Sequence, residues 1–323
     1  MPTITYLEGV IAAQREEMER DPSVFLMGED VTWNIQGTTK GLVEQFGPER
    51  VRDTPISEAG FLGAGAGAAM VGMRPVVEIL MAPFLYVAFD QLVSIIAKST
   101  YLYGGQASLP LTIRLPLFYG GGNAAQHSDR PWSTVMTIPG LKIAIPSTAA
   151  DAKGLLKSAI RSNDPVLVFE DANCWSSRGE VPDDDDFLIP LGQANVLRTG
   201  ADVTIVAIAS TVKMAQDAAN QLAEDGIQAE VIDPRTINPL DKDTILDSVR
   251  KTGRLVAVDP AHRMGSFASE LSAIVAQECF WDLQAPVERV TTPHTHIPFA
   301  REMERPLYPN VDKIVAAVRR TMG

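Results

Sequence analysis

Apolar and polar residues alternate along this chain in two patterns: short apolar runs of strand length, and longer segments with apolar residues at helical spacing. The first helical segment follows Thr5, because Thr5 and Glu8 form a capping box and apolar residues recur at helical spacing as far as Met18. Asp21-Pro22 ends this helix, and Val24–Met27 then form a strand. The N-terminal region thus begins as helix and strand in succession.

The same alternation continues through the rest of the chain. The expected strands are Val76–Leu80, Leu111–Arg114, Val203–Ala209, Ala229–Asp233 and Leu255–Asp259. The expected helices between them include Asp90–Lys98 and Val212–Glu224, the second of which stops at Gly226. This pattern predicts an α/β fold in which each sheet is mostly parallel, is flanked by helices and has right-handed crossovers.

A change of composition between Cys174 and Pro190 marks a domain boundary, because the acidic run Asp183–Asp186 has the character of a solvated linker. The pattern of strands and helices restarts after it. We therefore expect a first domain over residues 1–175, an acidic linker over 176–190 and a second domain over 191–323.

Charge and cysteine content exclude several classes of protein. A formal net charge of −12 repels phosphate backbones and anionic lipid, so neither nucleic acid nor a membrane surface is expected as a partner. Cys174 and Cys279 fit no metal or redox spacing. We find no secretory signal at the N-terminus and no apolar stretch of membrane-spanning length. A cytoplasmic location is the expectation.

Glu58 stands at the start of the uncharged segment Ala59–Met73, which consists mostly of Gly and Ala. Such a segment is a weak helix former that approaches a neighbouring backbone or ligand closely, and it is normally buried. A carboxylate beside it needs a hydrogen-bonding partner. The alternative is a structural glutamate favoured by the helix dipole, worth about 0.3–1 kcal/mol.

Two further acidic or basic residues are candidates for chemistry. Glu29 follows the strand Val24–Met27, and α/β proteins often place functional groups at such strand ends. His127 follows the flexible loop Gly120–Gly122. The structural alternatives are a solvated loop for Glu29 and a structural histidine for His127.

Other catalytic motifs are weak or absent. Residues Gly63–Ala68 fit a loose GxGxxA pattern, but they lie inside the small-residue segment rather than between a strand and a helix. The sequence contains no GxSxG, HExxH or GxxxxGK[ST] motif.

Several motifs together resemble one family over essentially the whole chain. They are Asp53–Glu58, Ala88–Gln91, Gln126–Ser128, Pro139–Lys142, Asp151–Leu156, Asp233–Ile237 and Pro239–Asp241. The chain resembles the β subunit of the E1 component of 2-oxo acid dehydrogenase complexes, in the transketolase-like group of thiamine diphosphate enzymes. This resemblance implies a pyrimidine-binding domain followed by a transketolase-type C-terminal domain.

The resemblance also implies roles for particular residues. Glu58 matches the glutamate that hydrogen-bonds N1′ of the cofactor's aminopyrimidine, which drives the 4′-amino group to the imino form that deprotonates the thiazolium C2. Phe84 matches the aromatic residue that stacks on the pyrimidine, and Leu80 would line the same pocket. His127 matches the active-site histidine that orients substrate or moves a proton. Glu29 resembles the acid of a proton path between two active sites.

A potassium site is implied by the same resemblance, because Ala159–Pro165 is similar to the family's potassium loop. Oxygen atoms suit such a hard cation. The implied ligands are Leu111, Ala159, Ser162 and Asp164.

The chain departs from the family in two places. Asp129 stands where the family usually has Gln after His-Ser, which leaves the acyl donor undetermined. There is also no Gly-Asp-Gly segment with a following Asn, the pattern that holds Mg²⁺ and the diphosphate. The resemblance therefore implies that an α subunit supplies those Mg²⁺ ligands within an α₂β₂ heterotetramer.

The activity implied is oxidative decarboxylation of a 2-oxo acid, pyruvate or branched-chain, with acyl transfer to a lipoyl-bearing E2 acyltransferase. The β subunit of acetoin dehydrogenase is a close alternative. A non-catalytic paralogue that acts as an assembly partner is the alternative from a different class, although the presence of Glu58, Phe84 and His127 together speaks against it.

Overall fold

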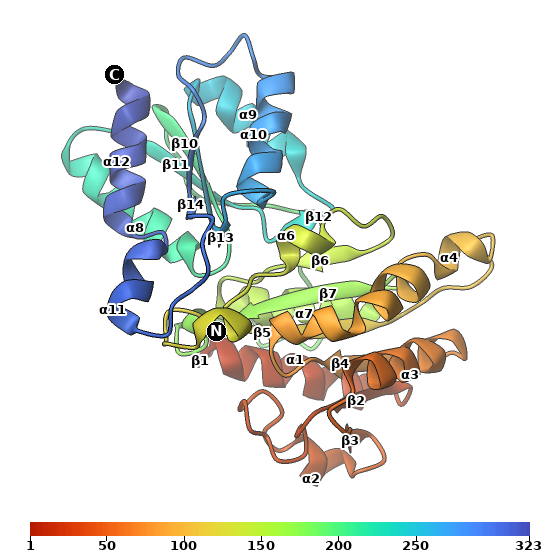
Figure 1. Cartoon of the computed structure of the whole chain (residues 1–323). Coiled ribbons are helices and arrows are strands. Elements are labelled where there is room, and N and C mark those ends of the chain that lie inside the picture. The colour runs from red at the N-terminus through yellow and green to blue at the C-terminus, as the bar shows by residue number, and fades with distance from the viewer. The chain divides into compact units, whose positions relative to one another are not determined.

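The computed structural model describes residues 1–323, which divide into two compact units (Figure 1). Unit 1 comprises Met1–Phe118 and Thr134–Leu191, and unit 2 comprises Tyr119–Ser133 and Gly192–Gly323. The segment 119–133 thus belongs to unit 2, although the chain on both sides of it belongs to unit 1. Both units contain mostly parallel sheets with helices against them, which confirms the predicted fold class.

The main sheet of unit 1 is parallel throughout. Its strands lie in the order β6 (Lys142–Ala144), β7 (Val166–Asp171), β5 (Thr112–Leu117), β4 (Arg74–Glu78), β2 (Val24–Gly28) and β3 (Val51–Asp53). All side chains of β2, β5 and β7 are buried, as expected for strands covered on both faces. A separate antiparallel pair joins β1 (Thr3–Thr5) to β8 (Arg178–Glu180).

Helices cover both faces of this sheet. Their bounds are α1 (Tyr6–Arg20), α2 (Leu42–Phe46), α3 (Glu58–Met70), α4 (Ser99–Leu102) and α7 (Ala149–Arg161), with short 3₁₀ helices η1 (Ala82–Ala88) and η3 (Ala172–Cys174). The predicted helix over 90–98 is a π-helix, η2 (Gln91–Ile96). Adjacent residues of β4 point to opposite faces: Val76 joins the core under α1 and α7, whereas Val77 meets Gly65 of α3.

Helix α1 begins with the predicted capping box, in which the Thr5 backbone N–H donates to Glu8 at 2.7 Å and the Glu8 N–H donates to the Thr5 hydroxyl at 3.1 Å. Its C-cap is Asp21, as the sequence predicts. The structure also has a capping box at α7, formed by Thr148 and Asp151. Both helices therefore have their first N–H groups satisfied locally.

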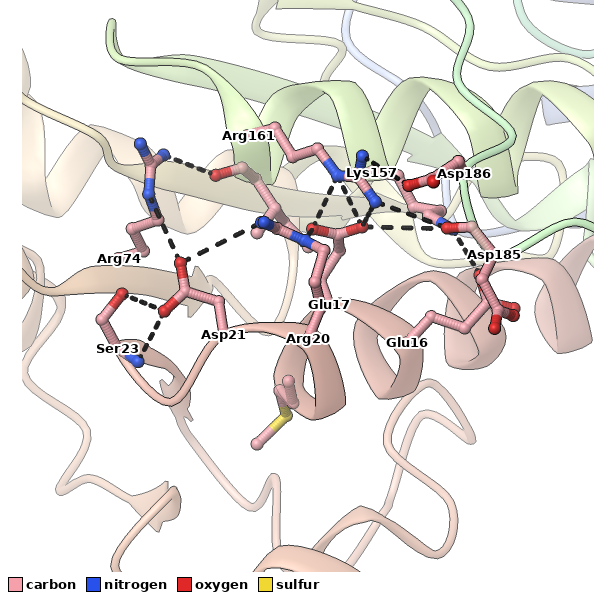
Figure 2. Close-up of polar contacts among 12 residues, drawn as sticks. Glu16, Glu17, Arg20, Asp21, Ser23, Arg74, Lys157, Arg161, Asp185 and Asp186 are labelled. Atoms are coloured by element: carbon pink, nitrogen blue, oxygen red, sulfur yellow. Dashed lines mark hydrogen bonds and ion pairs between the residues drawn. The ribbon is translucent and has the colours of Figure 1, made fainter.

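A network of ion pairs joins α1 to α7 and to the acidic segment that follows β8 (Figure 2). Glu17 of α1 is fully buried and lies 2.8 Å from the guanidinium of Arg161. Lys157 of α7 is also buried, and its ammonium group lies 2.5 Å from Glu16 and donates to the carbonyl of Asp185. Arg161 contacts Asp186 at 3.1 Å. Residues 183–186 are exposed, yet two of them are bound to α7 within unit 1.

Helix α3 is formed from the small-residue segment that the sequence predicts to be buried, and it is buried on one side only. A Cβ atom on Gly65 would lie 2.7 Å from Cγ2 of Val77, so the helix backbone packs directly on β4. On the other side, Gly67 has no atom within 4 Å of its Cβ position, and Val71 is 82% exposed. This chain alone therefore leaves one face of α3 uncovered.

Unit 2 contains a five-stranded sheet in the order β14 (Glu288–Thr292), β13 (Leu255–His262), β10 (Val203–Ala207), β11 (Ala229–Asp233) and β9 (Asn195–Arg198). Only β9 runs antiparallel. Helices α8 (Thr211–Glu224) and α12 (Val311–Met322) cover one face, and α9 (Lys242–Thr252) and α10 (Phe267–Glu278) the other (Figure 1).

The shorter elements of unit 2 are α5 (Ala124–His127), β12 (Thr236–Asn238), α11 (Arg301–Glu304) and the 3₁₀ helix η4 (Arg305–Leu307); α6 (Trp132–Val135) spans the boundary between the units. Strand β11 has the predicted bounds, and Gly226 ends the turn after α8 with a φ of +82°. No helix in the structure combines the length and apolarity needed to cross a membrane.

Candidate active site

The carboxyl ends of β3, β2 and β4 meet at one edge of the unit 1 sheet. The register pairs Gly28 with both Asp53 and Glu78, so all three strands end at the same level. Glu29 follows β2 directly, and Glu58 begins α3 after β3. Open parallel sheets bind ligands at this edge.

Glu29 and Glu58 form a buried pair of carboxyl groups at this edge. They are 4% and 5% exposed. Burial raises the pKa of Glu29 to about 7, with further contributions from the charges of Glu58 and Asp30. Its Oε1 atom is buried without a hydrogen-bond partner from the chain. A carboxyl group with these properties holds or releases a proton near neutral pH.

The loop that carries Glu29 is held in place from several sides. A Cβ atom on Gly28 would lie 2.5 Å from the carbonyl oxygen of Glu78, so only glycine fits the start of this loop. The Thr32 N–H donates to Asp53 at 2.8 Å, and the Thr38 hydroxyl donates to Glu78 at 2.8 Å. The position of Glu29 is therefore fixed by contacts with β3 and β4.

Beneath the loop lies a buried charged cluster that sequence reasoning missed. Arg114 of β5 is fully buried and donates to Glu170 at 2.8 and 2.6 Å, to Gln14 at 3.1 Å and to Glu78. Burial lowers the pKa of Arg114, but the charges of Glu170 and Glu78 outweigh burial and raise it overall. Through Glu78 and Thr38, this cluster supports the loop of Glu29.

Leu80 and Phe84 follow β4 at the same edge. Both side chains are half-buried. The carbonyl of Leu80 accepts a hydrogen bond from Gln36 at 3.3 Å. Phe84 lies on η1, which contacts α3, the helix that begins at Glu58. The edge thus combines acidic groups with apolar and aromatic side chains, as a site for a heteroaromatic ring requires.

His127 lies in unit 2, at the end of α5. Its Nδ1 lies 3.1 Å from the carbonyl oxygen of Asn123. A carbonyl oxygen only accepts, so Nδ1 carries the proton and Nε2 is the basic nitrogen of the neutral ring. The next residue, Ser128, is fully buried, and its carbonyl accepts from the buried guanidinium of Arg130.

The residues of the implied potassium site lie together, but at the opposite edge of the sheet, where β5 and β7 begin. Their oxygens already have partners: the carbonyl of Leu111 accepts from the Val166 N–H at 3.0 Å, and that of Ala159 from the Ser162 N–H at 3.1 Å.

Two of these oxygens meet cationic side chains. The Ser162 carbonyl accepts from Arg74 at 2.9 Å, and Asp164 pairs with Lys142 at 2.8 Å. Arg74 and Lys142 therefore already provide positive charge at this loop, and we assign potassium no step in the chemistry. No group of three or more His, Cys, Asp or Glu side chains is arranged to hold a metal ion.

Two sequence profiles match most of the chain. The profile described as "Transketolase, pyrimidine binding domain" matches residues 3–173, and "Transketolase, C-terminal domain" matches residues 192–314. Among solved structures, the chain superposes on a "Split gene transketolase, inactive beta4 tetramer" with a TM-score of 0.81 at 25% identity, covering 99% of this chain and 98% of that one.

Curated relatives match at similar levels over nearly their whole length. The acetoin:2,6-dichlorophenolindophenol oxidoreductase subunit beta of Bacillus subtilis is 43% identical, over 99% of this chain and 97% of that one. The 2-oxoisovalerate dehydrogenase subunit beta of the same organism is 43% identical, over 99% and 98%. The pyruvate dehydrogenase E1 component subunit beta of Rickettsia felis is 44% identical, over 98% of each.

Proposed function

Because this chain belongs to the transketolase family, with its pyrimidine-binding and C-terminal domains, we propose that it is the β subunit of a thiamine diphosphate-dependent E1 enzyme. The reaction is oxidative decarboxylation of a 2-oxo acid, pyruvate or branched-chain, followed by acyl transfer to a lipoyl-bearing E2 acyltransferase. The observation that carries this proposal is the buried pair Glu29 and Glu58 at the carboxyl edge of the sheet.

The residues at this edge fit the aminopyrimidine half of the cofactor. A buried carboxylate at Glu58 suits a ring nitrogen that shares a proton, and Phe84 and Leu80 suit the faces of the ring. When bound, thiamine diphosphate supplies the carbanion that attacks the substrate carbonyl and the electron sink for decarboxylation.

We propose three roles for the chain's own acid and base groups. Glu58 holds the proton shared with the pyrimidine N1′. Glu29, with a pKa near 7, exchanges protons with Glu58 and with water in the site. His127 orients the substrate carboxylate or moves a proton through Nε2.

The proposal includes an α subunit that binds Mg²⁺ and the diphosphate and completes an α₂β₂ heterotetramer. Large apolar side chains near the carboxyl edge support a protein partner there: Trp33 is 77% exposed, Ile35 64% and Ile56 86%. The uncovered face of α3 supports the same partner. Binding of K⁺ and a cytoplasmic location remain predictions.

Acetoin dehydrogenase is the second candidate function. It is favoured by the acetoin oxidoreductase β subunits of Bacillus subtilis and Cupriavidus necator, which are 43% and 45% identical to this chain. The same acid and base residues would serve, because acetoin also presents a carbonyl carbon for attack. A non-catalytic role in assembly is the remaining alternative.

Reconstitution tests the proposal and separates the candidates. The chain is mixed with a candidate α subunit, thiamine diphosphate and Mg²⁺, and reduction of an artificial dye is followed with pyruvate, with 3-methyl-2-oxobutanoate and with acetoin. We expect turnover of one donor that requires both subunits and the cofactor. A correctly assembled complex that turns over none of the three would refute the enzymatic assignment.

A further inference from the structure

The loop that carries His127 is bound to a buried carboxylate from a distant part of unit 2. The backbone N–H groups of Gly120 and Gly122 donate to the two oxygens of Glu304, each at 2.7 Å. Glu304 is fully buried, and none of the roles proposed above for Glu29, Glu58 and His127 involves it. Two N–H groups that converge on one carboxylate form a small anion-binding nest, here filled by the chain's own side chain.

The backbone of this loop has an unusual conformation. Gly120 and Gly122 have φ angles of +78° and +81°. A Cβ atom on Gly122 would lie 3.1 Å from the carbonyl oxygen of Phe299, so the loop also approaches the chain before α11 closely. Arg301 donates to the carbonyl of Gly121 at 2.9 Å. Three successive glycines are thus held by residues of one short segment.

Glu304 is itself fixed by an aromatic group. The Tyr308 hydroxyl donates to its Oε1 at 2.9 Å, so the carboxylate accepts from three donors, as a buried charge requires. The Tyr308 ring lies against the guanidinium of Arg130 at 5.2 Å, and Arg130 lies 5.0 Å from the ring of Tyr119.

Arg130 completes the support on the other side of His127. Its guanidinium donates to the carbonyl of Ser128 and to the Thr292 hydroxyl, the latter at 3.3 Å. The chain is therefore held before His127 by Glu304 and directly after it by Arg130. Both holding residues are buried and both contact Tyr308.

We propose that Glu304 is a positioning residue that sets the geometry of His127 by binding the Gly120–Gly122 loop. This inference rests on the proposed function only in taking His127 as an active-site residue. Glu304 acts through the backbone and does not contact the substrate. In Glu304→Gln an amide N–H₂ replaces one accepting oxygen and faces an N–H donor, so at least one loop hydrogen bond is lost.

A double-mutant cycle on the reconstituted complex tests the proposal. We expect Glu304→Gln to lower kcat/KM for the accepted donor by about 10- to 100-fold, the scale of a small misplacement of a catalytic group. We expect no further loss when it is added to His127→Ala, and partial rescue in Glu304→Asp. Glu302→Gln changes the exposed neighbour on the same helix and is the matched control.

Hydrogen exchange gives a readout that does not depend on activity. We expect the amides of Gly120 and Gly122 to exchange faster in Glu304→Gln than in wild type or Glu302→Gln, while α12 and the sheet of unit 2 are unchanged. Equal activity of Glu304→Gln and wild type, additive losses with His127→Ala, or no effect of His127→Ala itself would overturn the positioning role. Failure of the proposed function is distinguishable, because wild type would then turn over no donor.

Discussion

Glu29 and Glu58 are both buried at the carboxyl edge of the unit 1 sheet, and burial together with the charge of Glu58 raises the pKa of Glu29 to about 7. The charge of Glu58 opposes ionisation of Glu29, and burial opposes it further. Glu29 therefore holds or releases a proton near neutral pH at the edge where Glu58 begins α3. A proton available at neutral pH suits a cofactor that must be protonated at one nitrogen and deprotonated at another.

Glu58→Gln tests the acid at the start of α3. We expect the variant to fold and to assemble with the α subunit, because the amide has the same size and shape as the carboxyl group. The shared proton is lost, so kcat should fall by about 100-fold or more. Dye reduction in the reconstituted complex measures this, with Glu44→Gln on the exposed surface of α2 as control. A Glu58→Gln variant of near-normal activity would contradict the assigned role.

Glu29→Gln tests the raised pKa. The pKa of Glu29 has its ordinary value of 4.5 in the unfolded chain and is about 7 in the folded chain. At pH values between these two, the folded state therefore binds more protons than the unfolded state. Stability should therefore fall as pH rises from about 4.5 to 7, by no more than about 3 kcal/mol from this group.

The measurement is urea unfolding of wild type and Glu29→Gln at pH 5 and pH 8. The difference in unfolding free energy between the two proteins cancels the contributions of other titrating groups. We expect the glutamine variant to gain stability relative to wild type at pH 8. An equal difference between the proteins at both pH values would show that Glu29 titrates normally.

Gly65→Ala and Gly67→Ala test the packing of α3 as a matched pair on one helix. The added methyl group of Gly65→Ala would lie 2.7 Å from Val77, whereas that of Gly67→Ala meets nothing. In urea unfolding of the isolated chain we expect a loss of about 1–2 kcal/mol at position 65 from overpacking. At position 67 we expect a gain of about 0.5–1 kcal/mol from helix propensity. Equal changes in unfolding free energy at both positions would mean that α3 does not pack against β4.

Arg114→Met tests the buried charged cluster. The substitution leaves Glu78 and Glu170 buried without their cation, which should cost about 3–5 kcal/mol of unfolding free energy. Arg52→Met removes an exposed pair with Glu49 and should cost less than about 1 kcal/mol. Chemical denaturation measures the unfolding free energy of both variants. Similar losses in Arg114→Met and Arg52→Met would contradict a structural role for the cluster.

Local signals in the sequence predicted much of the fold. The Thr5 capping box and the bounds of β11 follow from neighbouring residues alone, and the structure has both. The π-helix at Gln91–Ile96 was not predicted, since the spacing of its apolar residues is also compatible with a regular helix. In the candidate site, Glu29 and Glu58 are predictable from the sequence, because each stands at the edge of an apolar element.

Contacts between distant residues could not be predicted in this way. In the sequence, Arg114 is a single charged residue within an apolar strand. Its partners lie 36 and 56 positions away along the chain. Glu304 follows Gly120 by 184 residues, and no local pattern distinguishes it from its exposed neighbour Glu302. The sequence indicates the residues suited to chemistry. The residues that position them, such as Arg114 and Glu304, are identified only from contacts in the folded chain.

The grouping of segment 119–133 with unit 2 limits how this protein can be divided or recombined. A fragment that ends at residue 191 would retain His127 but lose Glu304, Tyr308 and Thr292, which support it. A chimaera that takes residues 192–323 from a relative would keep His127 of this chain. It would, however, replace the residues that support His127. Residues 1–191 and residues 192–323 are therefore not freely interchangeable between relatives. Substitutions near His127 and substitutions near Glu304 are expected to occur together.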